Sequence, residues 1–393
     1  MSILIPLPDA HPATCGGKAA TLAVLARAGL PVPDGFVVPF ATVEALDDGS
    51  DEALERAIGE QLTALGHAAM AVRSSASSED TAHASAAGQY ESTLAVRGPR
   101  AVLAAIRACR SSLTSSRAAD YWTTRTETGS QDGARMAVLV QRLVDAKASG
   151  VMFTPTQPGG PTRIEASWGL GPSVVDGVVT PDSYEVDADG SVRCSVGTKA
   201  TRLDRNPTDT GLVSTPTTED GRLDPALEPP QITALVDLGA QIARLLGAPQ
   251  DVEWALADGE LWILQARPIT APLPSSQHVA PHKDAPHHVG TPGSHGTATG
   301  TTRVVLGPSS FHRITPGDVL VCPYTDPAWT PLFRVVSAIV TETGGALSHA
   351  AIVAREHGIP AVLGVVDATT QIPDGARVTV DGTAGTVTLQ PRD

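Results

Sequence analysis

The sequence has little cysteine and a shortage of positive charge. Its four cysteines, Cys15, Cys109, Cys194 and Cys322, lie far apart and form no CxxC pair, so neither a disulfide framework nor a zinc site is indicated. Lysine and arginine number 28 against 42 aspartates and glutamates, which gives a formal net charge of −14. That balance disfavours nonspecific binding to nucleic acids and anionic membranes. Any nucleotide site must therefore use local positive charge.

Long apolar runs are also missing. No stretch approaches the ~18 residues of a membrane span. The N-terminal segment Met1–Pro12 is broken by prolines and lacks the basic region of a secretory signal peptide. We therefore expect a cytoplasmic protein with no membrane partner and no nucleic-acid partner. A chain of 393 residues can bury substantial cores, and its length suggests two or three domains.

Proline and histidine are concentrated in residues 271–290, which show no apolar periodicity. This composition is typical of a semi-rigid linker, and about 20 linker residues span at most roughly 65 Å when extended. The sequence thus predicts an α/β (α+β) protein with a first domain at 1–272, a Pro/His-rich linker at 273–290 and a small domain at 291–393. The linker histidines (His278, His282, His287 and His288) could suggest metal binding, but their spacing defines no helical or hairpin face.

Short strands and helices alternate along both domains. The sequence predicts helices over Ala19–Ala28, before a Gly/Pro turn, and over Ile232–Leu246. Strands are expected from apolar and β-branched runs at Phe36–Phe40, Met70–Arg73, Met136–Leu143, Gly150–Thr154, Leu261–Ala266, Thr301–Leu306, Val319–Val321, Ala338–Thr341 and Arg377–Val380.

His349 lies where a glycine-rich turn is expected to become a helix that ends at Gly358 and Pro360. Unpaired N–H groups and the helix dipole stabilise negative charge at a helix N-terminus. Imidazole titrates near pH 6.5, so its neutral, nucleophilic form is available at neutral pH. The position therefore suits a histidine that accepts a phosphoryl group, although a lone histidine before a helix is more often a simple cap.

The run Thr341–Val362, TETGGALSHAAIVAREHGIPAV, closely resembles the phosphohistidine swivelling domain of the pyruvate phosphate dikinase, phosphoenolpyruvate synthase and rifampin phosphotransferase superfamily. This resemblance implies a small β/α domain. It also implies that His349 is transiently phosphorylated.

Two N-terminal segments have the character of phosphate-binding loops. Gly16-Gly17-Lys18 precedes a helix, so its backbone and its cation can meet phosphates there. Arg73 ends a strand before the small, polar segment SSEDTAHASAAGQYEST, which offers backbone groups for a loop over phosphates. Taken alone, the second segment is more typical of a surface loop with an ordinary salt-bridging arginine.

These segments occur in the order of the ATP-grasp-like nucleotide-binding domain of the same superfamily and resemble it over most of residues 1–272. The resemblance implies that ATP is held by phosphate ligands, a covering loop, an adenine-binding strand and a further acidic residue; the corresponding residues are Lys18, Arg73, Ser85, Gly88, Gln89, Gln141 and Glu165. The family often has phenylalanine where this chain has Ala86.

Two further runs, DVEWA and LQARP, carry the most explicit chemistry. Alternation along a strand places Asp251 and Glu253 on one face, and Gln265 and Arg267 on one face of the neighbouring strand. Carboxylate and amide oxygens suit Mg²⁺, which Mn²⁺ can replace. By resemblance, Glu253 and Gln265 bind the metal, whereas Arg267 binds phosphates and offsets the charge that develops during transfer. A hairpin with ordinary surface charges is the alternative.

The resemblance implies that His349 attacks the β-phosphorus of ATP, that AMP leaves, and that the γ-phosphoryl is later removed by water or phosphate. The β-phosphoryl then passes to an acceptor hydroxyl or enol. No acceptor domain is visible in the sequence, so we expect the acceptor site on a partner chain. Two alternatives remain: a stand-alone kinase of a small hydroxylated metabolite or antibiotic, and a non-catalytic phosphocarrier or regulatory module.

Overall fold

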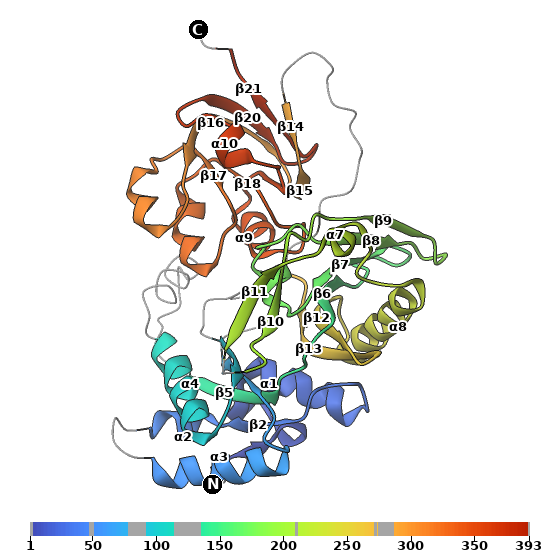
Figure 1. Cartoon of the computed structure of the whole chain (residues 1–393), viewed down its shortest axis with the longest axis vertical. Coiled ribbons are helices and arrows are strands. Elements are labelled where there is room, and N and C mark those ends of the chain that lie inside the picture. Colours follow the sequence, from blue (N-terminus) through green and yellow to red (C-terminus); the bar gives the residue numbers. More distant parts are fainter. Residues whose placement is uncertain are drawn as a thin grey trace.

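The computed structural model describes residues 3–46, 51–77, 92–113, 135–208, 211–270, 273 and 287–391. Three sheets follow one another along the long axis of the molecule, from the N-terminal sheet at the bottom of Figure 1 to the C-terminal sheet at the top. The first two sheets share one hydrophobic core, and the third has its own. The described residues therefore form two domains.

The first sheet has five antiparallel strands in the order β1-β2-β5-β3-β4. Alternate residues of its strands enter opposite cores: Leu139 packs toward α1 and Val138 toward α3 and α4. This period of two follows from the pleat of a strand. The elements are β1 (Ile5–Pro6), α1 (Pro12–Arg27), β2 (Gly35–Val38), α2 (Phe40–Glu44), α3 (Glu52–Ala64), β3 (Met70–Ala76), β4 (Ser92–Val96), α4 (Pro99–Ser112) and β5 (Met136–Arg142).

The second sheet has six antiparallel strands in the order β13-β12-β6-β7-β8-β9, and β10 and β11 form a separate ribbon. Helix α8 packs its apolar residues on one face of this sheet, where they join the core around α1. The elements are β6 (Ala148–Phe153), β7 (Thr162–Trp168), α6 (Pro172–Val175), β8 (Asp182–Val186), β9 (Val192–Ser195), β10 (Thr201–Arg205), β11 (Leu212–Pro216), α7 (Glu219–Leu223), α8 (Pro229–Leu246), β12 (Gln250–Ala257) and β13 (Glu260–Pro268).

The C-terminal domain is built on an eight-stranded sheet in the order β14-β21-β20-β16-β17-β18-β19-β15. Its central strands, β16 to β19, are parallel. Helix α9 packs on one face and α10 on the other. The elements are β14 (His287–Val289), β15 (Thr291–Ser294), β16 (Thr297–Val304), β17 (Val319–Cys322), the 3₁₀ segment η3 (Pro327–Arg334), β18 (Ala338–Thr341), α9 (His349–His357), β19 (Ala361–Leu363), α10 (Ala368–Gln371), β20 (Arg377–Asp381) and β21 (Thr386–Leu389).

Several element boundaries differ from those expected. Helix α8 begins at Pro229 because Glu228 and Gln231 form a capping box there. Strand β2 ends at Val38 because Pro39 is followed directly by α2. The backbone of His287–Val289 pairs with β21, so this part of the expected linker belongs to the C-terminal sheet. Edge pairing uses backbone groups alone, which explains why a Pro/His-rich composition did not reveal it. His278 and His282 lie outside the described residues.

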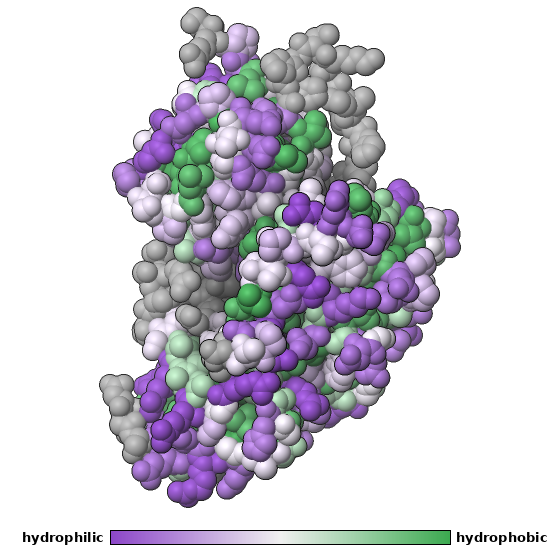
Figure 2. Space-filling model, viewed as in Figure 1, coloured by the Kyte–Doolittle hydropathy of each residue, from purple (hydrophilic) through white to green (hydrophobic). Residues whose placement is uncertain are grey.

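The visible surface is dominated by hydrophilic residues, with apolar residues scattered among them (Figure 2). Large apolar side chains that are well exposed, such as Leu223, Leu306 and Val366, come from separate parts of the chain. Single exposed apolar residues are normal for globular proteins. Among the described residues, none of the helices combines the length and apolarity needed to cross a bilayer.

Candidate active site

His349 is the first residue of α9, as the sequence predicts, and the helix ends at Gly358, which has a left-handed φ of 66°. The imidazole is 3% exposed. Its Nδ1 lies 3.2 Å from the hydroxyl of Thr325, and the ring of Phe333 meets it edge-on at a centroid distance of 6.3 Å. Its Nε2 is buried and has no hydrogen-bond partner among the described residues. Thr325 thus holds Nδ1, and Nε2 makes no hydrogen bond within the described residues.

The surroundings of His349 keep its imidazole neutral. Burial lowers the pKa of His349 to about 4, and the positive charge of Arg267 acts in the same direction, whereas Glu356 opposes them. A buried imidazole resists protonation because its charged form loses its hydration. At neutral pH, the imidazole is therefore uncharged, and one of its two nitrogens carries a lone pair.

The strands β12 and β13 are neighbours, as the sequence predicts, and their register places Asp251 opposite Arg267 and Glu253 opposite Gln265. Nε of Arg267 donates to Oδ2 of Asp251 at 2.9 Å, and both side chains are nearly buried. Burial, the largest effect, raises the pKa of Asp251, and Arg267 opposes it. The hairpin therefore fixes a guanidinium close to His349.

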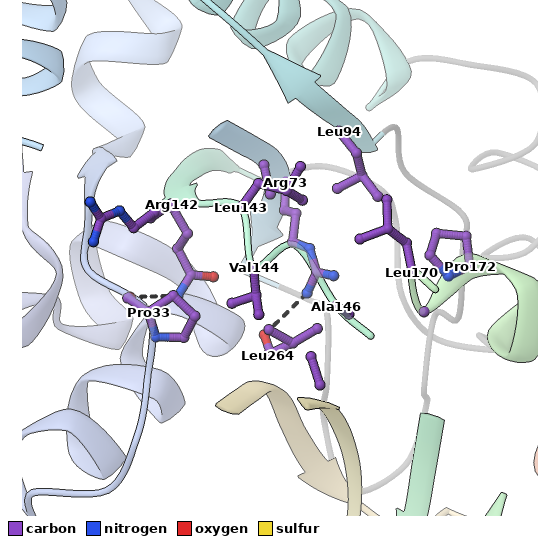
Figure 3. Close-up of a pocket in the computed structure, with 14 residues that line it drawn as sticks. Pro33, Arg73, Leu94, Arg142, Leu143, Val144, Ala146, Leu170, Pro172 and Leu264 are labelled. Carbon is purple, nitrogen blue, oxygen red and sulfur yellow. Dashed lines mark hydrogen bonds between the residues drawn. The ribbon is translucent and has the colours of Figure 1, made fainter. Parts of the chain in front are cut away.

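Arg73 joins the first sheet to the hairpin. Its guanidinium donates to the carbonyl of Leu264 at 3.1 Å and to Oε2 of Glu253 at 3.4 Å. Figure 3 shows the side chain of Arg73 extending into a pocket toward Leu264. Arg73 and Glu253 therefore lie together.

The pocket in Figure 3 lies between the first and second sheets and is mostly apolar. Its lining includes Ala71, Arg73, Gln141, Val144, Leu170 and Leu264. Gln141 is buried, pairs through its backbone with Gly35 and Ala71, and donates from its side chain to the carbonyl of Pro33 at 3.1 Å. The apolar lining and the arginine give the pocket the chemical character that a base with attached phosphates requires.

Lys18 follows a break in α1. Gly16 has a non-helical φ of 77°, and a Cβ at this position would lie 2.1 Å from the carbonyl oxygen of Ser75. The hydroxyl of Ser75 donates to the carbonyl of Cys15 at 2.6 Å and accepts from the amide of Ala19 at 3.1 Å. The break thus begins a new helical segment at Gly17-Lys18, beside the strand of Arg73. The helix expected at Ala19–Ala28 is part of this longer element.

Residues 46–287 match the family described as pyruvate phosphate dikinase, AMP/ATP-binding domain, and residues 314–385 match the PEP-utilising enzyme, mobile domain. The chain belongs to the pyruvate phosphate dikinase family. Its N-terminal domain is therefore an ATP-grasp-like AMP/ATP-binding domain, and its C-terminal domain is the mobile domain, as the sequence motifs indicate.

Curated relatives in this family include a probable phosphoenolpyruvate synthase of Methanothermobacter thermautotrophicus, 35% identical over 95% of this chain and 61% of the relative. The phosphoenolpyruvate synthase of Escherichia coli is 38% identical over 84% of this chain and 45% of the relative. The chain thus spans about half the length of the relatives it matches. Among solved structures, the L-amino acid ligase from Bacillus licheniformis is 13% identical over 65% of this chain and 43% of the ligase, with a TM-score of 0.30.

The family resemblance placed Glu165 near the nucleotide, but its carboxylate contacts the mobile domain. The carboxylate of Glu165 accepts a hydrogen bond of 3.2 Å from the amide of Leu347, two residues before His349. Burial raises the pKa of Glu165 to about 7, and hydrogen bonds from the amides of Leu347 and Ala346 oppose the rise. Ser85, Gly88 and Gln89, expected in a loop over the phosphates, lie outside the described residues.

Four residues at the site carried no clear sequence signal: Thr325, Asp326, Asp176 and Arg355. Thr325 holds His349, and Asp326 caps η3 by accepting from the amide of Ala328 at 2.7 Å. Burial, followed by repulsion from Glu253 and Asp326, raises the pKa of Asp176 to about 7. A polar residue before a helix was the only local hint of Asp326. Thr325, Asp176 and Arg355 are brought to the site by tertiary contacts, which the local sequence does not reveal.

Proposed function

We propose that this protein is an ATP-dependent phosphotransferase of the dikinase type, which carries the phosphoryl group on Nε2 of His349. The decisive observation is the state of this imidazole: Nδ1 is held by Thr325, and Nε2 is buried without a partner among the described residues. The matches to an AMP/ATP-binding domain and to a PEP-utilising mobile domain support the same conclusion.

In the proposed reaction, Nδ1 of His349 carries the ring proton and donates to Thr325, which leaves the lone pair on Nε2. Nε2 attacks the β-phosphorus of ATP, the P–N bond forms, and the bond to the α-phosphate oxygen breaks so that AMP leaves with the electron pair. The γ-phosphoryl is then removed by water or phosphate. A covalent relay of this kind divides one difficult transfer into two easier ones.

Three cations take part in this proposal, two as phosphate ligands and one at the reacting histidine. Lys18 at the restarted helix and Arg73 in the pocket hold the phosphates of ATP. Arg267, held by Asp251, faces the reacting histidine and offsets the charge that develops on the transferred group. Gln141 belongs to the strand that meets the adenine.

Mg²⁺ fits the oxygen donors of Glu253 and Gln265, which face each other across the hairpin. The described residues contain no group of three His, Cys, Asp or Glu side chains that could hold a metal by themselves. Magnesium commonly takes one or two protein ligands and completes its shell with phosphate oxygens and water. When bound, it would neutralise phosphate charge, and Mn²⁺ would serve in its place.

We propose an enol or hydroxyl oxygen as the acceptor, because the curated relatives are phosphoenolpyruvate synthases. These relatives are considerably longer than the part that this chain matches. That difference supports an acceptor site outside the two matched domains. The mobile domain would then carry the phosphoryl group from ATP to this second site.

The variant His349→Ala tests this proposal when it is compared with the wild-type chain in Mg²⁺ and ATP. We expect the variant to bind ATP as the wild type does but to form no acid-labile phosphoprotein and no AMP. Transfer or AMP formation at the wild-type rate by the variant would overturn the relay. ATP binding without labelling in the wild-type chain would instead indicate a non-catalytic module.

A further inference from the structure

Glu165 connects the two domains at the loop that carries His349. The residue lies in the middle of β7 in the ATP-binding domain, and it is 3% exposed. Its carboxylate accepts from the amide of Leu347 at 3.2 Å and also from the amide of Ala346. Both donors belong to the loop directly before the nucleophile. A shift of this contact would therefore move the imidazole.

The approach is so close that the loop needs a glycine. A Cβ added at Gly345 would lie 2.3 to 2.4 Å from the carboxyl atoms of Glu165, which are its three nearest neighbours. Real Cβ atoms do not approach other atoms at such distances. The φ of Gly345 is not positive, so its backbone conformation does not by itself demand glycine. Glycine is required at this position because any side chain would clash with the carboxylate of Glu165.

The same loop is held from both domains. The mobile domain's own Arg355 donates to the carbonyl of Ala346 at 2.7 Å, and its positive charge also acts on Glu165. The hydroxyl of Thr343 donates to the carbonyl of Gly177 at 2.6 Å, and the amide of Gly344 donates to Val179 at 3.1 Å. Leu347 packs against the ATP-binding domain. The loop is thus a docking element with polar partners at its centre.

We propose that Glu165 is a positioning residue for phosphoryl transfer, whose carboxylate docks the loop 344–348 and so sets His349 against the ATP-binding domain. This inference rests on the proposed function. Glu165 is not among the residues lining the pocket in Figure 3, and a carboxylate facing triphosphate would repel it. Its amide partners in the loop give it a different role from that of a nucleotide ligand.

A carboxylate suits a contact that must form and break. Water replaces the two amide donors when the domain leaves, so the net free-energy difference between the docked and undocked states stays small. In the docked arrangement, burial raises the pKa of Glu165 to about 7, because its charged form is shielded from water. A purely apolar contact would be harder to release, and a mobile domain has to be released in every cycle.

The test compares the full-length wild-type chain with Glu165→Ala, Glu165→Gln and a control, Ser167→Ala. Ser167 lies two residues along β7, and its buried hydroxyl has no partner among the described residues. Each variant is assayed for ATP affinity and for the single-turnover rate of His349 phosphorylation. We expect Glu165→Ala to slow phosphorylation about ten- to hundredfold with unchanged ATP affinity, since a buried charged hydrogen-bond partner is lost. Glu165→Gln keeps an oxygen acceptor and should recover most of the rate, and Ser167→Ala should match the wild type.

A double-mutant cycle with Gly345→Ala makes the test specific. In the wild-type background, the new methyl group clashes with the carboxylate of Glu165 and should slow phosphorylation strongly. In the Glu165→Ala background the clash is gone, so Gly345→Ala should add little further loss. Additive losses would overturn the inference, because they would show that the two residues do not act on each other.

The outcomes separate this inference from the proposed function. Wild-type labelling with an equally fast Glu165→Ala variant would overturn the docking role and leave the phosphotransferase intact. A tenfold or larger loss of ATP affinity in Glu165→Ala with normal transfer would instead make Glu165 a nucleotide ligand. Absence of wild-type labelling would refute the proposed function. Docking would then be judged from the distance between dyes on the two domains, and an unchanged distance in Glu165→Ala would refute the inference.

Discussion

At the scale of single residues, one hydroxyl orients the imidazole of His349, and burial of the ring keeps it neutral. Thr325 occupies Nδ1 at 3.2 Å, and Nε2 has no partner among the described residues. The hydroxyl can donate or accept, so this contact orients the ring with either tautomer. In the proposed reaction Nδ1 is the donor, which leaves the lone pair on Nε2.

The variant Thr325→Val should slow phosphorylation of His349 about five- to tenfold, the amount expected from the loss of one ordinary hydrogen bond. Valine nearly preserves the shape of the fully buried threonine, so ATP affinity should not change. Rapid-quench measurement of AMP gives the rate, and Thr325→Ser, which keeps the hydroxyl, is the control. A rate equal to that of the wild type would show that the hydroxyl does not orient the ring.

The protonation of His349 gives a second prediction. Its pKa is lowered to about 4 by burial, so the ring should stay neutral from pH 8 down to pH 5. Nitrogen NMR of the labelled imidazole, assigned with His349→Ala, measures this directly. An ordinary histidine in the unfolded chain titrates near pH 6.5. Unfolding therefore takes up a proton below this pH, and His349 should reduce stability as pH falls from about 6.5 to 4. A midpoint near 6.5 in the folded protein would contradict the burial argument.

At the scale of elements, the β12–β13 hairpin carries the charges that serve the site. Asp251 and Arg267 face each other in register, and both side chains are at most 10% exposed. A buried pair of this kind adds little net stability as a whole, but removal of one partner leaves the other charge uncompensated. The hairpin is therefore sensitive to single substitutions.

Asp251→Asn should lower the free energy of unfolding by about 3 kcal/mol, because Arg267 loses its buried carboxylate partner. Urea denaturation measures the loss. The double variant Asp251→Asn/Arg267→Met removes the charge as well and should recover part of that stability. Equal stability of Asp251→Asn and the wild type would show that the pair has little influence on the hairpin.

The helices and strands around the site could be predicted from the sequence where their signals are local. Gly358 marks the end of α9, and alternation along two neighbouring strands places Asp251 with Glu253 and Gln265 with Arg267, although their register comes from the structure. The contacts of Thr325 and Glu165 were not legible, since their partners lie 24 and 182 residues away in the sequence. The pairing of β14 was hidden as well, because an edge strand needs only its backbone. Local sequence signals thus predicted individual helices and strands, whereas the contacts between them depend on tertiary packing.

At the scale of the whole molecule, the structure shows the mobile domain docked on the ATP-binding domain. Helix α9 lies against the second sheet in Figure 1, and the docking surface combines the apolar contacts of Leu347 with hydrogen bonds to Glu165 and Gly177. In this arrangement, Arg267 acts on His349 across the domain boundary. The docked state is therefore the one in which the proposed histidine phosphorylation takes place.

The origin of the phosphoryl group tests the central claim most directly. The purified chain is incubated with Mg²⁺ and with ATP labelled at either the β- or the γ-phosphorus, and label on the protein, AMP and ADP are measured without an acceptor. We predict acid-labile label on His349 from β-labelled ATP together with AMP release, and loss of γ-label from the protein as the γ-phosphoryl departs. Stable label from γ-labelled ATP, accompanied by ADP and no AMP, would contradict the dikinase-type relay.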